Sequence, residues 1–333
     1  MNAPKDVSQP VPSIANTLGL WSYDNGVWSL DSGYFRDSFD AVHLIEDNGE
    51  VAIVDAGTQY SVPRILQAIE SLGLTPNDVR YILLTHVHLD HAGGAGLLAE
   101  HCPQAKVVVH PRGSRHLIDP SKLWQAVCQV YTQEIAERDY GGMIPIDSSR
   151  IVEATEALHL RLGSRHIDFW DAPGHALHHV FIVDEGSNAI FTGDTFGISY
   201  RELDSPQGAF TFVTSSPSQF DPNTHQASVE RVMKAKPKAV YLTHYSELRQ
   251  VQSAGEALLN QVDCYAALAL KHGHRSEGRA EAIMADLEEL LFSQIKDHGC
   301  LLSQDEVKAL LALDLRLNAD GLICWLDRIK LSS

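Results

Sequence analysis

Residues 85–94 read THVHLDHAGG, and this stretch decides how the rest of the sequence is interpreted. It places three imidazoles and one carboxylate within six residues. These side chains belong to His86, His88, Asp90 and His91. The preceding apolar run at residues 81–84 predicts a buried strand. A turn that leaves a strand can point such side chains at one centre, so the spacing predicts a site for one or two metal ions.

Three more candidate ligands lie farther along the chain. Each follows an apolar run that predicts a strand. They are His175, Asp194 and His244, which follow residues 166–171, 189–192 and 239–242. Ligands of α/β sheets bind at the carboxyl ends of strands, so we expect these side chains to lie beside residues 86–91.

With these motifs the sequence resembles the metallo-β-lactamase superfamily. The matching motifs are VDAG at 54–57, THVHLDHAGG at 85–94, APGH at 172–175, TGDT at 192–195 and LTH at 242–244. The resemblance covers roughly residues 20–248. It implies an α/β fold of the four-layer αββα kind, in which two β-sheets lie between helices and the metal site occupies one edge.

The resemblance also implies a binuclear ligand set. It assigns His86, His88 and His175 to a first metal, Asp90, His91 and His244 to a second, and Asp194 to both. Imidazole and carboxylate suit two divalent ions, with zinc expected and iron or manganese as alternatives. We expect Asp55 and His179 to contact the ligands from behind. The alternatives are a turn-capping role for Asp55 and a packing role for His179.

The function expected from this site is metal-dependent hydrolysis. Two close divalent ions lower the pKa of a shared water, so a metal-bridging hydroxide could attack the carbonyl carbon of a small thioester, lactone or related ester. Asp90 would act as the catalytic residue that orients the hydroxide and moves a proton. One alternative is a non-hydrolytic diiron protein that binds or reduces oxygen. Another is a binding module that keeps the metals without turnover.

The sequence indicates candidate substrate-binding residues less strongly than it indicates the metal ligands. Arg112 and His116 follow a strand predicted at 106–109 and could bind a carboxylate, with a surface loop as the alternative. Tyr245, beside His244, could stabilise an oxyanion, with simple packing as the alternative. A helix predicted at 121–137 and a loop at 197–220 are further candidates for lining the pocket. The substrate is expected to be a small molecule.

Composition excludes other partners. The 333 residues include 26 Lys and Arg against 43 Asp and Glu, a formal net charge of −17, which argues against nucleic acid and anionic membranes. The sequence has no apolar run of about 18 residues and no secretory signal. Five scattered cysteines without a CxxC pair indicate free thiols in a reducing compartment. A cytoplasmic location is the expectation.

The character of the chain changes after about residue 250, where strand signals stop and helical spacing begins. We therefore expect a metallohydrolase domain over residues 1–248 and an all-helical extension over 249–333. The extension is expected to supply packing or the surface of a homodimer.

Overall fold

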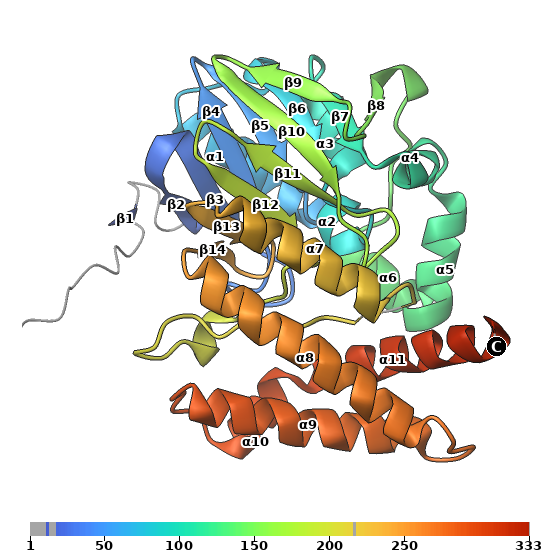
Figure 1. Cartoon of the computed structure of the whole chain (residues 1–333). Helices are drawn as coiled ribbons and strands as arrows, with labels where there is room; N and C mark the ends of the chain where they lie inside the picture. The colour runs from blue at the N-terminus through green and yellow to red at the C-terminus, as the bar shows by residue number, and fades with distance from the viewer. Residues whose placement is uncertain (1–10, 13–17, 216–217, 333) are drawn as a thin grey trace, which may run out of the picture.

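The computed structural model describes residues 11–12, 18–215 and 218–332, and it contains two β-sheets (Figure 1). The first sheet has eight strands, paired in sequence order. They are β1 (Val11–Pro12), β2 (Leu20–Ser22), β3 (Val27–Asp31), β4 (Ala41–Asp47), β5 (Glu50–Val54), β6 (Val79–Leu83), β7 (Lys106–Val109) and β8 (Ile151–Glu153). The second sheet has six strands in the order β14-β13-β12-β11-β10-β9. They are β9 (His159–Leu162), β10 (Arg165–Asp171), β11 (Val180–Asp184), β12 (Ala189–Gly193), β13 (Ala239–Leu242) and β14 (Ser246–Leu248).

Both sheets are mixed. Strands β5 to β8 pair in parallel, as do β12 and β13, and the other pairs are antiparallel. The turn between β4 and β5 places Asn48 at φ 55° and Gly49 at φ 79°, which is the left-handed geometry that two-residue hairpins require.

The helices include short one-turn segments and long helices near the carboxyl end. The α-helices are α1 (Val62–Ser71), α2 (Leu89–Ala92), α3 (Ala95–His101), α4 (Pro111–Ile118), α5 (Ser121–Tyr131), α6 (Gln133–Tyr140), α7 (Pro222–Ala235), α8 (Val251–His272), α9 (Arg279–Asp297), α10 (Gln304–Leu310) and α11 (Ala312–Ser332). The 3₁₀ segments are Asp24–Gly26, Gln59–Ser61, Pro76–Asp78, Ser148–Arg150 and Arg201–Leu203.

Three apolar cores fix the order of the layers. Between the sheets, Leu83 of the first packs in one cluster with Phe169 and Phe191 of the second. The outer face of the first sheet is covered by α1 and α3, which contribute Ile65 and Leu98 among others. The outer face of the second sheet is covered by α7 and α8. The layers therefore run helix, sheet, sheet, helix, and the αββα expectation is confirmed.

The carboxyl-terminal helices α8 to α11 form the helical region that the sequence predicted (Figure 1). Its buried side chains, such as Tyr265, Leu287 and Leu322, belong to the same apolar cluster as Phe212 and the outer face of the second sheet. The division into domains 1–248 and 249–333 stays a prediction. Among the residues that the structure describes, no helix has the length and hydropathy needed to cross a membrane.

The prediction of one continuous helix over residues 121–137 is wrong. The helix is interrupted at Thr132, which has φ 76° and ψ 155° and separates α5 from α6. The Thr132 hydroxyl accepts a hydrogen bond from Ile135 N and so caps α6. No side chain of α5 is fully buried, and its apolar residues pack only partly against the cluster that contains Ala136 and Tyr140 of α6. This packing does not force the two segments into one continuous helix.

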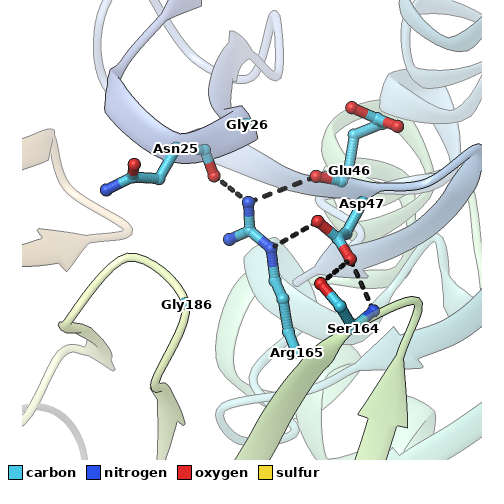
Figure 2. Close-up of a pocket in the computed structure, with 7 residues that line it drawn as sticks. All are labelled: Asn25, Gly26, Glu46, Asp47, Ser164, Arg165 and Gly186. Atoms are coloured by element: carbon cyan, nitrogen blue, oxygen red, sulfur yellow. Dashed lines mark hydrogen bonds and ion pairs between the residues drawn. The ribbon is translucent and has the colours of Figure 1, made fainter.

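One buried arginine joins the two sheets at the end where β10 begins. Figure 2 shows the Arg165 guanidinium reaching the carbonyl oxygens of Asn25 and Glu46 and the carboxylate of Asp47, all in or beside the first sheet. Arg165 Nη1 also donates to Asp184 Oδ2 at 2.7 Å, and Asp184 is fully buried. Arg165 is therefore an ionic link between the layers.

Replacing this arginine should destabilise the fold. We expect Arg165→Ala to lower the free energy of unfolding by about 3–5 kcal/mol, because Asp184 is left buried without its counter-charge. Urea denaturation measures the change. In the matched control, Arg138→Ala removes an exposed arginine paired with Asp139 and should cost less than about 1 kcal/mol. Equal losses in the two variants would contradict the proposed link.

Candidate metal centre

The candidate ligands converge where several strands end. Asp55 follows β5, His86 lies shortly after β6, and His175, Asp194 and His244 follow β10, β12 and β13. Residue His88 is the N-cap of the one-turn helix α2, and the first turn of α2 carries Asp90 and His91. These side chains come together because the segments that carry them follow strands ending at the same edge of the sandwich.

The first group of potential ligands is His86, His88, His175 and Asp194, with one ligand atom of each within 4.8 Å of the others. The Nδ1 atom of His88 lies 2.8 Å from Nε2 of His86 and 3.1 Å from Nε2 of His175. Asp194 Oδ2 lies 3.5 Å from His175 Nε2. Three imidazole nitrogens and one carboxylate oxygen thus face one small space.

The second group is Asp90, His91 and His244. Asp90 Oδ2 lies 3.8 Å from His91 Nε2 and 3.5 Å from His244 Nε2. The other oxygen of Asp194, Oδ1, lies 3.3 Å from His91 Nε2 and 3.8 Å from His244 Nε2. Asp194 therefore presents one oxygen to each group.

Hydrogen bonds behind the histidines fix which nitrogen faces inward. His91 Nδ1 lies 2.8 Å from Asp55 Oδ2, and His244 Nδ1 lies 2.7 Å from the Phe39 carbonyl oxygen. His175 Nδ1 lies 3.4 Å from the Thr214 carbonyl oxygen. Because these oxygens only accept, each Nδ1 carries a proton, and Nε2 is the nitrogen that faces the cluster.

Asp55 and His179 contact the cluster from behind. The Asp55 carboxylate accepts from Thr85 N and from Thr243 Oγ1, both at 2.9 Å, in addition to His91. His179 Nε2 accepts from the backbone N–H of Asp194 at 3.3 Å. Each of the two residues thus touches the side chain or backbone of a candidate ligand.

The two groups differ in charge. Burial and neighbouring imidazoles keep the pKa of His86 well below its ordinary value, so this ring is neutral. Burial opposes protonation of His244 as well, but the Asp194 and Asp90 carboxylates outweigh it and raise the pKa of His244 to about 9. Burial disfavours the charged form of Asp90, yet the charges of His91 and His244 lower its pKa to about 2. A cation entering the second group would displace protons from its imidazoles.

The arrangement fits divalent cations. His91 Nε2 and Asp194 Oδ1 are buried and have no hydrogen-bond partner among the described residues. Buried polar atoms are rarely left unpaired, and both atoms point at the space shared by the second group. The donor set of imidazoles and carboxylates suits zinc, iron or manganese. His88 and Asp90 are partly exposed, so the cluster opens to solvent on their side.

Among the residues that the structure describes, the predicted substrate contacts form no hydrogen bond or ion pair with a candidate ligand. Tyr245 is 6% exposed and lies near Ser38. Arg112 is exposed on α4, and His116 Nε2 accepts from Arg115 Nε at 3.2 Å. The roles of Tyr245, Arg112 and His116 stay predictions.

Two tyrosines that the sequence did not single out lie near Asp90. Tyr34 OH donates to Tyr140 OH at 3.1 Å, and their rings stack with centroids 5.6 Å apart. Burial and then neighbouring charge, including that of Asp90, raise the pKa of both phenols. The two stacked phenols thus lie close enough to Asp90 for its charge to act on them.

Asp40 was also missed. Both of its carboxylate oxygens are buried without a hydrogen-bond partner among the described residues, and burial raises its pKa to about 7. A lone Asp before a strand gives no signal of this kind in the sequence. The carbonyls of Phe39 and Thr214 could not be found either, since every residue type has a carbonyl group.

Comparisons with known proteins agree with this geometry. The family model described as the metallo-beta-lactamase superfamily matches residues 38–244. A metallo-beta-lactamase fold-containing protein, ST1585 of Sulfurisphaera tokodaii, is 28% identical over 174 residues, which cover 49% of this chain and 59% of that protein. Hydroxyacylglutathione hydrolase GloC of Haemophilus influenzae is 27% identical over 172 residues, 51% of this chain and 73% of GloC. The chain spans 34% to 59% of the length of the first curated relatives that it matches.

A solved structure shows the same fold over more of the chain. The metallo-beta-lactamase family protein TTHA1429 from Thermus thermophilus has a TM-score of 0.63 at 18% identity. The match covers 92% of this chain and 94% of that one. At this identity the likeness concerns the fold alone.

The contact between Asp55 and His91 generates a test. We expect Asp55→Asn to weaken Zn²⁺ binding about 10- to 100-fold, because the amide no longer fixes the His91 tautomer with a charge-assisted bond. Competition with a chromophoric chelator measures the affinity. Asp168→Asn is the matched control, since Asp168 contacts His159 at 2.7 Å at the surface. Equal Zn²⁺ affinity in both variants would show that Asp55 does not support a ligand.

Proposed function

Because this chain belongs to the metallo-β-lactamase superfamily, we propose that it is a binuclear metal-dependent hydrolase that cleaves a small thioester, lactone or related ester. The observation that carries the proposal is the position of Asp194. Its Oδ2 faces the group of His86, His88 and His175, and its Oδ1 faces His91 and His244. A carboxylate shared in this way suits two cations held side by side.

The chain would hold one divalent cation in each group, with zinc as the proposed metal and iron or manganese as alternatives. When bound, the pair makes water acidic enough to lose a proton at neutral pH and polarises a carbonyl group. With metal bound, the imidazoles would supply neutral Nε2 or Nδ1 atoms as ligands. The hydrogen bonds of His91 to Asp55 and of His244 to the Phe39 carbonyl keep these two rings turned inward.

Asp90 is the proposed catalytic residue. Its side chain is partly exposed, whereas His91 beside it is fully buried. Asp90 therefore faces both the ligand space and the opening to solvent. As an ionised carboxylate in this position, Asp90 would accept a proton from the attacking water and return it to the leaving group.

The surroundings of Asp90 support a small acyl substrate. Tyr34 and Tyr140 present stacked aromatic rings beside it, and Phe35 of the same loop is 65% exposed. Two relatives carry the name hydroxyacylglutathione hydrolase, GloC and the protein of Rhodopseudomonas palustris, which is 29% identical over 161 residues. We extend from them only the ester and thioester class. A small-molecule substrate, a cytoplasmic location and a possible homodimer belong to the same proposal.

Metal removal tests the reaction class. We expect the protein to bind about two equivalents of metal. Dialysis against a chelator should abolish hydrolysis of a panel of thioesters and lactones, and added Zn²⁺ should restore it. Phosphodiesters serve as the comparison substrates. Undiminished hydrolysis after the metals are removed would contradict the proposal. A metal-loaded protein that holds iron, consumes oxygen and hydrolyses nothing would instead support the diiron alternative.

The role of Asp90 generates a second test. We expect Asp90→Asn to lower kcat about 10²- to 10⁴-fold, because the amide cannot accept the proton. Metal content measured on the same sample separates this effect from loss of a ligand. Asp139→Asn, which changes an exposed carboxylate on α6, is the control and should retain kcat. A fully metal-loaded Asp90→Asn variant with unchanged kcat would refute the catalytic role.

A further inference from the structure

Two amide side chains are buried inside the carboxyl-terminal helical region. Gln261 on α8 is 2% exposed, and Asn318 on α11 is 1% exposed. Each lies within a helix whose other buried residues are mostly apolar. A buried amide is unfavourable unless all its polar atoms are hydrogen-bonded, so the partners of these two side chains indicate what the helices are holding.

Both amides bind the same segment, residues 211–215. Gln261 Oε1 accepts from Val213 N at 2.9 Å, and its Nε2 donates to the Thr211 carbonyl at 3.1 Å. Asn318 Oδ1 accepts from Ser215 N at 2.7 Å, and its Nδ2 donates to the Val213 carbonyl at 3.3 Å. Each amide thus pairs with one N–H and one carbonyl, as a neighbouring strand would.

The segment held in this way contacts a candidate metal ligand. Thr214 lies between the clamped residues Val213 and Ser215, and its carbonyl oxygen lies 3.4 Å from His175 Nδ1. This separation is at the long end for a hydrogen bond, whereas the matching partners of His91 and His244 lie at 2.8 Å and 2.7 Å. The hydrogen-bond partner of His175 Nδ1 is thus a loop carbonyl whose distance from the ring depends on how residues 211–215 are placed.

We infer that Gln261 and Asn318 are positioning residues for His175, acting through the 211–215 segment. In addition to covering the second sheet, the helical region then fixes the orientation of His175, one proposed ligand of the first metal. The inference rests on the proposed metal centre, but it does not depend on which substrate is cleaved.

A second route from α11 reaches the other group. Tyr200 OH donates to Asp314 Oδ1 at 2.9 Å, and the Tyr200 ring stacks on Phe39 with centroids 5.4 Å apart. The Phe39 carbonyl is the acceptor for His244 Nδ1. This route reaches His244 without passing through Asn318 or His175, although the Tyr200 ring also contacts Phe212, with centroids 5.6 Å apart. Substitutions at Asn318 should therefore affect one of two metal equivalents and spare the other.

Stepwise titration of the full-length, metal-free protein with Co²⁺ tests the inference, with visible absorption as the readout. In Asn318→Ala, we expect the affinity for one equivalent to fall about tenfold, with a changed absorption band for that equivalent. The other equivalent should bind as in the unmodified protein. Gln261→Ala should change the same equivalent, although its side chain lies on a different helix.

Leu322→Ala is the matched control for lost packing, since Leu322 is fully buried on α11 and its side chain forms no hydrogen bond with residues 211–215. It should lower Tm while leaving both Co²⁺ steps unchanged. If Asn318→Ala does not fold, Ser215→Ala replaces it, because it deletes only the hydroxyl that donates to the Asn318 backbone carbonyl at 2.9 Å and to its side-chain Oδ1 at 3.1 Å.

The outcomes separate the two proposals. Unchanged Co²⁺ binding in the folded Asn318 or Ser215 variant would overturn the inference and leave the metal centre standing. The same spectral change in Leu322→Ala would also overturn it, since general loosening of the helices would then be the cause. An unmodified protein that binds no Co²⁺ would refute both the metal centre and the inference.

Discussion

The structure depends on the buried carboxylate of Asp55, which accepts hydrogen bonds from three segments of the chain. Thr85 follows β6 in the first sheet, Thr243 follows β13 in the second, and His91 lies on α2. A carboxylate that is 1% exposed is tolerated only with such donors. The contact that orients His91 is therefore part of the same network that joins the edges of the two sheets.

The parts of the fold and site that sequence could predict are local. An apolar run marks a strand within a few residues, and the Asn48-Gly49 pair marks its hairpin. His86, Asp194 and His244 were located because each follows such a run, so strand prediction and ligand prediction relied on the same signal. The four-layer arrangement, with two sheets between helices, came from the resemblance rather than from periodicity.

What sequence could not predict depends on long-range contacts. The carbonyls of Phe39 and Thr214 orient two histidines, and a backbone carbonyl leaves no mark in the sequence. Gln261 and Asn318 resemble ordinary polar positions on amphipathic helices, and only packing shows that they are buried. The break at Thr132 was missed because apolar residues on α5 and α6 keep helical spacing across it.

The Arg165 link and the Asp55 network lie at opposite ends of the sandwich, since β10 begins at Arg165 and ends towards His175. The two sheets are thus linked by polar contacts at both ends, which opposes their separation at either end. Movements that admit a substrate would then involve elements at the periphery of the sandwich. The helix α5, none of whose side chains is fully buried, and the loop carrying Tyr34 lie outside both of these links. Variation in those two elements could change which molecules enter while the ligand cluster keeps its geometry.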